Sequence, residues 1–294
     1  MTPHDAAVTD DGRTVSRSDR RFRSIIGSPL APGTRVVLGV VGVALALAAY
    51  EYYVYHQAQL GGNPRFSPGL GQLWTAFQEV TELDPRTGTV PFWVDTIASL
   101  GILAKGLAIG IAMSTVLGLL MGVLSTVHAM LSPVVTAIAK VPPTAMIALF
   151  MVVFGVTGDT FKIALIVFGI SPTLAIGIML VARAVPKNTI VKAYSLGAST
   201  PQVIVKAILP QITPQIIDMI RLSVGPAWIY LIAAEYINSS EGLGHGIELS
   251  KRMVRIDHIL VYVIWLAILG TAIDVAFHAL ARRVAPWSTT RKDD

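Results

Sequence analysis

Six apolar runs, each long enough to cross a bilayer as a helix, dominate this chain. They lie at about 36–55, 96–124, 134–156, 161–182, 216–237 and 259–281. A spanning helix needs roughly 20 mostly apolar residues, and a helix satisfies its own backbone hydrogen bonds in lipid. The sequence therefore predicts an all-α polytopic membrane protein with six transmembrane helices.

Composition agrees with a membrane protein. Hydrophobic residues make up 53% of the chain and charged residues 14%, whereas about a quarter of a soluble domain is charged. The absence of cysteine excludes disulfides and thiolate metal sites, and the six histidines show no metal-ligand spacing. We read the net charge of +5 as the basic bias of cytoplasmic flanks. We therefore expect a lipid bilayer around the chain, no bound metal and no nucleic acid.

The distribution of lysine and arginine predicts the orientation. Basic residues gather in both tails and in the segment at 183–215, which contains no acidic residue. On the opposite side of the membrane, basic residues are interleaved with acidic ones, as in the connections at 56–95 and 238–258. The positive-inside rule then places both termini and the 183–215 segment in the cytoplasm. A five-span arrangement would put the two tails on opposite sides.

The same reading divides the chain into four parts. We expect residues 1–34 to form a disordered cytoplasmic tail, because they are polar and poor in large apolar residues. Residues 35–95 would hold the first transmembrane helix and an external loop whose aromatic residues favour short interfacial helices. Residues 96–287 would form the core domain, and 288–294 a cytoplasmic C-terminal tail.

The second and third apolar runs carry residues that shape helix contacts. Small residues recur every four positions in the second run, at Gly106, Gly110, Ser114, Gly118 and Gly122. Such a stripe allows close helix approach, and it also suits a face that lines a pathway. Pro142 and Pro143 in the third run, and Pro172 in the fourth, predict kinks.

Charged residues inside the runs are candidates for function, because an unpaired charge at the bilayer centre costs about 2.5–3.5 kcal/mol on insertion scales. They are Lys105, Lys140, Asp218, Arg221, Glu235 and Asp274. By position in their runs, Lys105 and Glu235 fall toward the external side and the others toward the cytoplasm. We predict an ion pair between Arg221 and Asp274, and a Lys105 that faces the interior on the side of Glu235. Structural pairing or snorkelling is the alternative for each.

The segment at 188–216, between the fourth and fifth runs, reads as an amphipathic helix–turn–helix. Gly197 permits a turn, and Pro201 stands where a second helix can begin. Val203, Ile204, Ala207 and Ile208 then recur at helical spacing. Leu209-Pro210 would end this helix ahead of the fifth run. We expect the apolar face that these four residues form to fill a groove on a partner.

This segment resembles the EAA loop of binding-protein-dependent ABC import permeases. Ala193, Gly197, Leu209 and Pro210 match that pattern at the right distances. The chain departs at Val191 and Lys192, where the family has Glu and Ala, and at Ala207, where Ile is frequent.

Further stretches resemble the nitrate, sulfonate/taurine and bicarbonate permease subfamily. They are Leu196-Gly197-Ala198-Ser199, Arg221-Leu222, Ala227-Trp228-Ile229, Ala233-Ala234-Glu235 and Gly242-Leu243-Gly244, together with Pro142-Pro143, Phe154-Gly155, Asp274 and Trp287.

The resemblance implies a type I ABC importer transmembrane-domain fold and the role of its permease subunit. Such a subunit forms the pathway for a small anionic solute (nitrate, sulfonate, taurine or bicarbonate-like) that a periplasmic or lipid-anchored binding protein delivers. It pairs with a second permease copy, expected as a homodimer, in the bacterial plasma (inner) membrane. A separate ABC ATPase binds ATP and Mg. The chain carries no Gly-x-x-x-x-Gly-Lys-Ser/Thr phosphate loop, so we expect it to bind no cofactor and to be non-catalytic.

The resemblance and the residue pattern together nominate specific positions. For ATPase coupling, in helices at 188–209, these are Ala193, Leu196, Gly197, Ala198, Ser199, Ile204, Ala207, Leu209 and Pro210. For the pathway they are Lys105, Ser114, Trp228 and Glu235. Two alternatives stay open: an ion-gradient-driven secondary transporter, which would typically show inverted repeats, and a membrane enzyme, which would need clustered catalytic groups.

Overall fold

The computed structural model of the protein describes residues 32–61 and 67–284, and nearly all of these are helical. No β-strand occurs in the described ranges, apart from an isolated bridge between Asp84 and Thr89. The chain divides into two compact units, Met1–Gly62 and Asn63–Asp294. Most of the predicted N-terminal tail and the whole predicted C-terminal tail lie outside the described residues.

The first unit contains the helix α2 (Pro32–Gln59). Its stretch Val36–Gln59 is long and apolar enough to cross a membrane. The side chains described along this stretch are mostly exposed within the unit. The first apolar run thus forms a helix of spanning length, as predicted.

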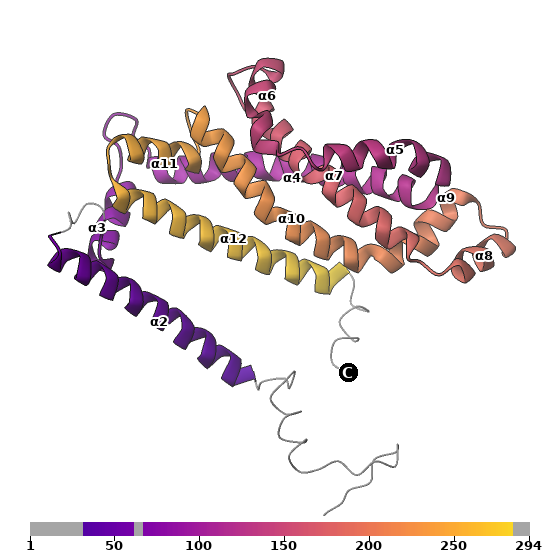
Figure 1. The fold of residues 1–294 in the computed structure, drawn as a ribbon, viewed down its shortest axis with the longest axis horizontal. Helices are drawn as coiled ribbons and strands as arrows, with labels where there is room; N and C mark the ends of the chain where they lie inside the picture. Colours follow the sequence, from indigo (N-terminus) through magenta and orange to yellow (C-terminus); the bar gives the residue numbers. More distant parts are fainter. Residues whose placement is uncertain (1–31, 62–66, 285–294) are drawn as a thin grey trace, which may run out of the picture. The chain divides into compact units, whose positions relative to one another are not determined.

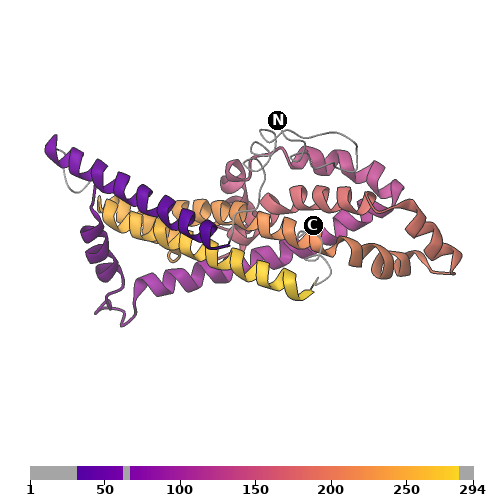
Figure 2. The same ribbon diagram turned by 90° about the horizontal axis from the view of Figure 1, so that it is seen from below.

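Four long helices build the second unit: α4 (Pro91–Val123), α7 (Thr160–Arg183), α10 (Leu209–Ile237) and α12 (Ile256–Val284). They run lengthwise in the same general direction in both views (Figures 1 and 2). With α2, the described part of the chain holds five helices that could span a bilayer, or six spans if one bent helix pair counts as a span. The all-helical, polytopic prediction is confirmed.

The small-residue stripe of α4 packs directly against α7. A Cβ added at any of its four glycines would come within 2.8 Å of an α7 atom, at Gly106, Gly110, Gly118 and Gly122. Ser114 is fully buried in the same contact, where its Oγ donates to the carbonyl of Gly110 at 2.5 Å. The packing interpretation of the stripe is therefore confirmed.

The third apolar run does not form one straight helix. It is divided into α5 (Ser125–Ile138), the 3₁₀ helix η1 (Pro143–Met146) and α6 (Ile147–Phe154), and the two halves are bent by 83°. Pro142 and Pro143 stand at the bend, where they provide no backbone N–H and disfavour a helical residue before them. The predicted kink is thus a complete break, whereas Pro172 lies inside an uninterrupted α7.

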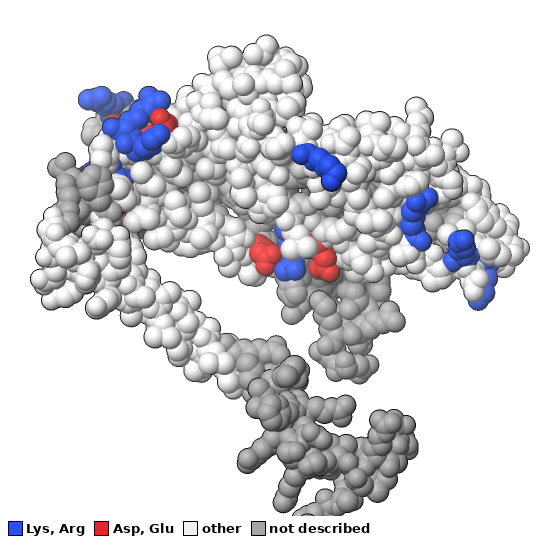
Figure 3. Space-filling view, viewed as in Figure 1, with Lys and Arg blue, Asp and Glu red and all other residues white. Residues whose placement is uncertain are grey.

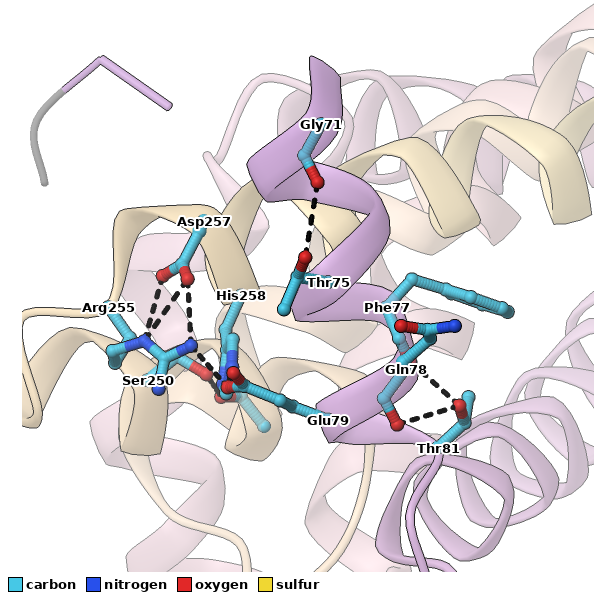
Figure 4. Close-up of polar contacts among 11 residues, drawn as sticks. Gly71, Thr75, Phe77, Gln78, Glu79, Thr81, Ser250, Arg255, Asp257 and His258 are labelled. Atoms are coloured by element: carbon cyan, nitrogen blue, oxygen red, sulfur yellow. Dashed lines mark hydrogen bonds and ion pairs between the residues drawn. The ribbon is translucent and has the colours of Figure 1, made fainter. Parts of the chain in front are cut away.

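Two short helices, α3 (Leu70–Val80) and α11 (Leu243–Arg252), lie at the end of the second unit where α12 begins. In both views α3 runs across the direction of α12 (Figures 1 and 2). Arg255, just before α12, contacts the Glu79 carboxylate of α3 at 2.5 Å, and Nε2 of His258 lies 3.1 Å from the same carboxylate (Figure 4). The hydrogen bonds from Arg255 and His258 hold the pKa of Glu79 below its usual 4.5. This polar contact fixes α3 to α12.

Candidate functional site

The segment that follows α7 forms a helix and a sharp turn. Helix α8 (Lys187–Ser195) begins after Pro186. It ends at Ser195, and the turn follows at Gly197, whose φ of +80° lies in the left-handed region that favours glycine. The N–H of Ala198 donates to the carbonyl of Ala193 at 3.1 Å, which closes the helix end. The predicted turn at Gly197 is present.

A second helix begins at once and continues into the next span. Ser199 and Gln202 form a capping box at the start of α9 (Thr200–Gln202). The π-helix η2 (Val203–Ile208) follows, and the N–H of Leu209 donates to the carbonyl of Ile204.

The prediction that Leu209-Pro210 ends the second helix is wrong. Residues Thr200–Ile237 form one helical stretch of 38 residues. Pro210 lies in the first turn of α10, where a missing N–H is tolerated, and the wide π-turn precedes it. Such π-turns are frequent at functional sites.

The apolar face of this second helix packs on the protein's own core. Val203 and Ile208 are each 1% exposed and join a cluster with Ile178 and Ile212. Partly buried against the same cluster are Ala193, Ala198, Ala207 and Leu209, and Ile204 is half-buried. The expectation that this face fills a groove on a partner is therefore wrong.

A different set of apolar side chains is exposed on the segment. Leu196 is 88% exposed, and Val191, Tyr194 and Val205 are also exposed; we call these four residues the exposed tip. Three further coupling candidates, Gly197, Ser199 and Pro210, are exposed as well. Sequence reasoning nominated Leu196 of this tip, but it missed Val191, Tyr194 and Val205.

The charge around the exposed tip is basic. Lys187, Lys192 and Lys206 are all exposed, and the sequence has no acidic residue from 183 to 217. In Figure 3 the mostly white α8 end of the second unit carries blue patches and no red ones. The opposite end, around α11, carries both signs (Figure 3).

The structure brings Arg221 and Asp274 together. Nη1 of Arg221, in α10, lies 3.4 Å from Oδ1 of Asp274, in α12. Both side chains retain exposed surface in this chain. The contact joins two spans that are far apart in sequence.

Lys105 does not face Glu235. Glu235 is 1% exposed, and its carboxylate lies 2.7 Å from Oγ of Ser99 and 2.9 Å from the N–H of Gly244. Lys105 is exposed on α4 and makes no ion pair within the described ranges. Trp228 is buried in the main core cluster. Of the four pathway candidates, only Lys105 is therefore exposed, since Ser114 lies inside the α4–α7 contact.

Sequence reasoning missed Asp95 and Ser99, which fix the start of α11. Asp95 Oδ1 accepts from the N–H of Gly242, and Ser99 Oγ accepts from the N–H of Leu243, each at 2.8 Å. These two contacts anchor the stretch at 239–246 in the core. The i, i+4 spacing of two polar residues on one face of an apolar helix was the available signal.

The described residues contain no group of three or more His, Cys, Asp or Glu that could hold a metal ion. The described part of the chain thus combines a packed helical body with the exposed tip and a few intramembrane charges.

Comparison with known proteins identifies relatives of this chain. Residues 106–286 match the family described as binding-protein-dependent transport system inner membrane component. The chain is 32% identical over 195 residues to the taurine transport system permease protein TauC of Escherichia coli (strain K12), covering 66% of this chain and 70% of the relative. It is 30% identical over 184 residues to an aliphatic sulfonates transport permease protein of Bacillus subtilis (strain 168), covering 63% and 66%.

A solved structure shares the fold. The MetNI methionine ABC transporter in an inward-facing conformation superposes with a TM-score of 0.57 at 19% identity, covering 66% of this chain and 97% of that one. The family match spans well over half of the sequence. The chain belongs to the family of inner-membrane components of binding-protein-dependent transport systems, and it is a non-catalytic permease subunit of an ABC importer.

Proposed function

We propose that this permease moves a small anionic solute of the nitrate, sulfonate, taurine or bicarbonate type, and that a separate ATPase drives it through the exposed tip. The observation that carries the proposal is a helix–turn–helix whose inner face is buried in its own chain while Val191, Tyr194, Leu196 and Val205 stay exposed. Such a segment is anchored on one side and free for a partner on the other.

The connection to α10 explains how motion at the tip reaches the spans. The second helix of the segment passes through η2 into α10 without a break, over Thr200–Ile237. A displacement of the tip therefore moves α10 as a lever. ATP, bound with Mg in the partner, shifts the permease between states only through its different affinity for them.

The remaining features of the importer follow the same reasoning. Two copies of the chain, related by a two-fold axis, form the pathway, and both termini and the exposed tip lie in the cytoplasm, because the basic segments gather there. The opposite end, which holds α3 and α11, receives the external binding protein. A cleft of about 700 Å³ at that end has both apolar and polar lining residues, and its polar residues include Glu82, Asp84, Glu241 and His245.

The solute class is supported by the relatives. The named relatives are permeases for taurine and for aliphatic sulfonates, and the sequence resemblance extends to nitrate and bicarbonate permeases. These solutes share a compact anionic group.

Reconstitution tests the proposal. The permease, its ATPase and its binding protein would be placed in proteoliposomes and supplied with labelled taurine, ethanesulfonate, nitrate or bicarbonate. We expect uptake of at least one anion that requires ATP and both partners. Uptake driven by an ion gradient through this chain alone would instead favour the secondary transporter, and ATP-driven uptake of none of these anions would refute the solute class.

A further inference from the structure

The break in the third span lies at the middle depth of the helical bundle. We call residues 139–142, between α5 and η1, the elbow. On one side of it, Val135 packs in a cluster with Ala175 of α7. On the other side, Ile147 packs in a cluster with Leu165 of α7. The elbow therefore lies beside the central turns of α7, and Lys140 is deeper than its position in the apolar run predicts.

The backbone of the elbow is unsuited to lipid. Pro142 and Pro143 have no N–H to offer to the carbonyls of the preceding turn. Non-helical backbone at membrane depth is tolerated only where protein buries it or where it lines a water-filled cavity. Within this chain the elbow is not buried, because Lys140, Val141 and Pro142 are all exposed. The elbow must therefore face water or a second protein surface.

The charge of Lys140 favours water. Its side chain makes no hydrogen bond or ion pair within the described ranges, and a lysine at the bilayer centre costs about 2.5–3.5 kcal/mol on insertion scales. Helix α7 is about 36 Å long at 1.5 Å per residue. Each membrane surface is therefore farther from the elbow than a lysine side chain extends by snorkelling.

Other intramembrane charges differ from Lys140 in this respect. Arg221 is paired with Asp274, and Glu235 is buried among hydrogen-bond donors. Lys105 is exposed, but it lies on the uninterrupted helix α4, whose backbone is satisfied in any surroundings. Asp218 likewise lies within the regular helix α10. Of the six intramembrane charges named above, only Lys140 combines a free charge with an irregular backbone.

We propose that the elbow lines the translocation pathway at its middle depth, and that Lys140 provides the positive charge past which the anionic solute moves. The inference rests on the proposed function as an importer of an anionic solute. Lys140 is the residue that would attract such a solute inside the membrane. A rigid elbow, held by α5 and α6 against α7, keeps that charge in the aqueous space.

Thiol labelling tests whether the elbow meets water. The chain has no cysteine, so Lys140→Cys introduces a single thiol into the full-length permease, assembled with its ATPase in membrane vesicles. The probe is a charged, water-soluble methanethiosulfonate. The matched control is Ala227→Cys, at a fully buried site that shares a core cluster with Ile166 and Ile170.

We expect the Lys140→Cys thiol to react at least an order of magnitude faster than the Ala227→Cys thiol. Equal, slow rates would overturn the proposal. If Lys140→Cys does not accumulate in the membrane, Val141→Cys in the same elbow gives the same test. This labelling needs neither solute nor ATP hydrolysis, so its result is independent of whether the proposed solute class is right.

Charge substitution tests the role of the lysine. In the complete importer, Lys140→Gln should lower ATP-driven uptake of ethanesulfonate several-fold, whereas Lys140→Arg should retain most of it. Uptake by Lys140→Gln at the wild-type rate would refute the charge role. Failure of the wild-type importer to move any anion would refute the proposed function, while the labelling result would still decide the position of the elbow.

Discussion

The contact between α4 and α7 and the segment at 187–208 use apolar residues in opposite ways. In the first, small residues bring two long helices together so closely that a Cβ has no space at four positions. In the second, one apolar face is buried at Val203 and Ile208 while Leu196 stays 88% exposed. The difference separates a fixed body from a surface that we propose a partner covers.

The largest effect is expected where the fixed body has no space. A Cβ at Gly118 would lie 2.7 Å from the backbone carbonyl oxygen of Ala175, so Gly118→Ala should destabilise the permease by about 1–3 kcal/mol through overpacking. The matched control is Gly101→Ala on the same helix, which meets nothing within 4 Å. Thermal denaturation of both purified variants measures the difference; equal melting temperatures would contradict the close contact.

A polar substitution should affect stability differently on the buried and the exposed face of the segment at 187–208. Val203→Ser removes a fully buried side chain and buries a hydroxyl, which should cost about 1–3 kcal/mol. Leu196→Ser changes an exposed residue, so its stability should stay within about 0.5 kcal/mol of the wild type, while ATP-driven uptake falls several-fold. Stability assays and uptake by the full importer test both. A Leu196→Ser variant with full uptake would count against the exposed tip as the coupling surface.

The Arg221–Asp274 pair connects α10, the proposed lever, to α12. Reversing either charge alone should place like charges 3.4 Å apart and lower the amount of folded permease in the membrane several-fold. The double reversal, Arg221→Asp with Asp274→Arg, should restore much of that loss. Expression measured by fluorescence of a fused reporter provides the comparison, and a double reversal no better than the single ones would disprove the pairing.

The smallest effect concerns the α3 contact. Because hydrogen bonds lower the pKa of Glu79 in the folded state, its contribution is present above pH 4.5, its ordinary pKa, and is lost as pH falls through the folded value. We expect the labelling rate of a Trp74→Cys reporter on α3, divided by the rate of free cysteine at the same pH, to change modestly over that acidic range, because only the thiolate reacts. In the Glu79→Gln variant this pH-dependent change should be absent. A Glu79→Gln profile identical to that of the wild type would show that Glu79 does not fix α3.

Local sequence signals predicted much of the fold. Length and apolarity predicted helices of spanning length, and Gly197 predicted the turn. The four-residue spacing of Gly106 to Gly122 indicated a close helix contact, although not that α7 is the partner. Opposite charge at suitable depth gave Arg221 with Asp274. Each of these depends on residues close in sequence or on a single strong physical requirement.

The errors arose where tertiary packing decides the outcome. Periodicity shows that Val203, Ile204, Ala207 and Ile208 share a face, but it does not show which protein covers that face. Leu209-Pro210 reads as a helix end, yet the π-turn before it lets the helix continue. The i, i+4 spacing of Asp95 and Ser99 marks a polar face on an apolar helix, but it does not identify the partner. Their contacts with the start of α11 join positions more than a hundred residues apart.

Cross-linking from the exposed tip determines whether this surface contacts the ATPase. Leu196→Cys would be the only thiol of the permease, since the chain has no native cysteine. It would carry a photoactivatable group in the assembled importer, beside a matched Trp74→Cys variant, whose site on α3 is also exposed. We expect a cross-link to the ATPase from position 196, and its yield should change when ATP is added. We expect no cross-link to the ATPase from position 74. No cross-link from 196, or equal cross-linking from both sites, would contradict the proposed contact.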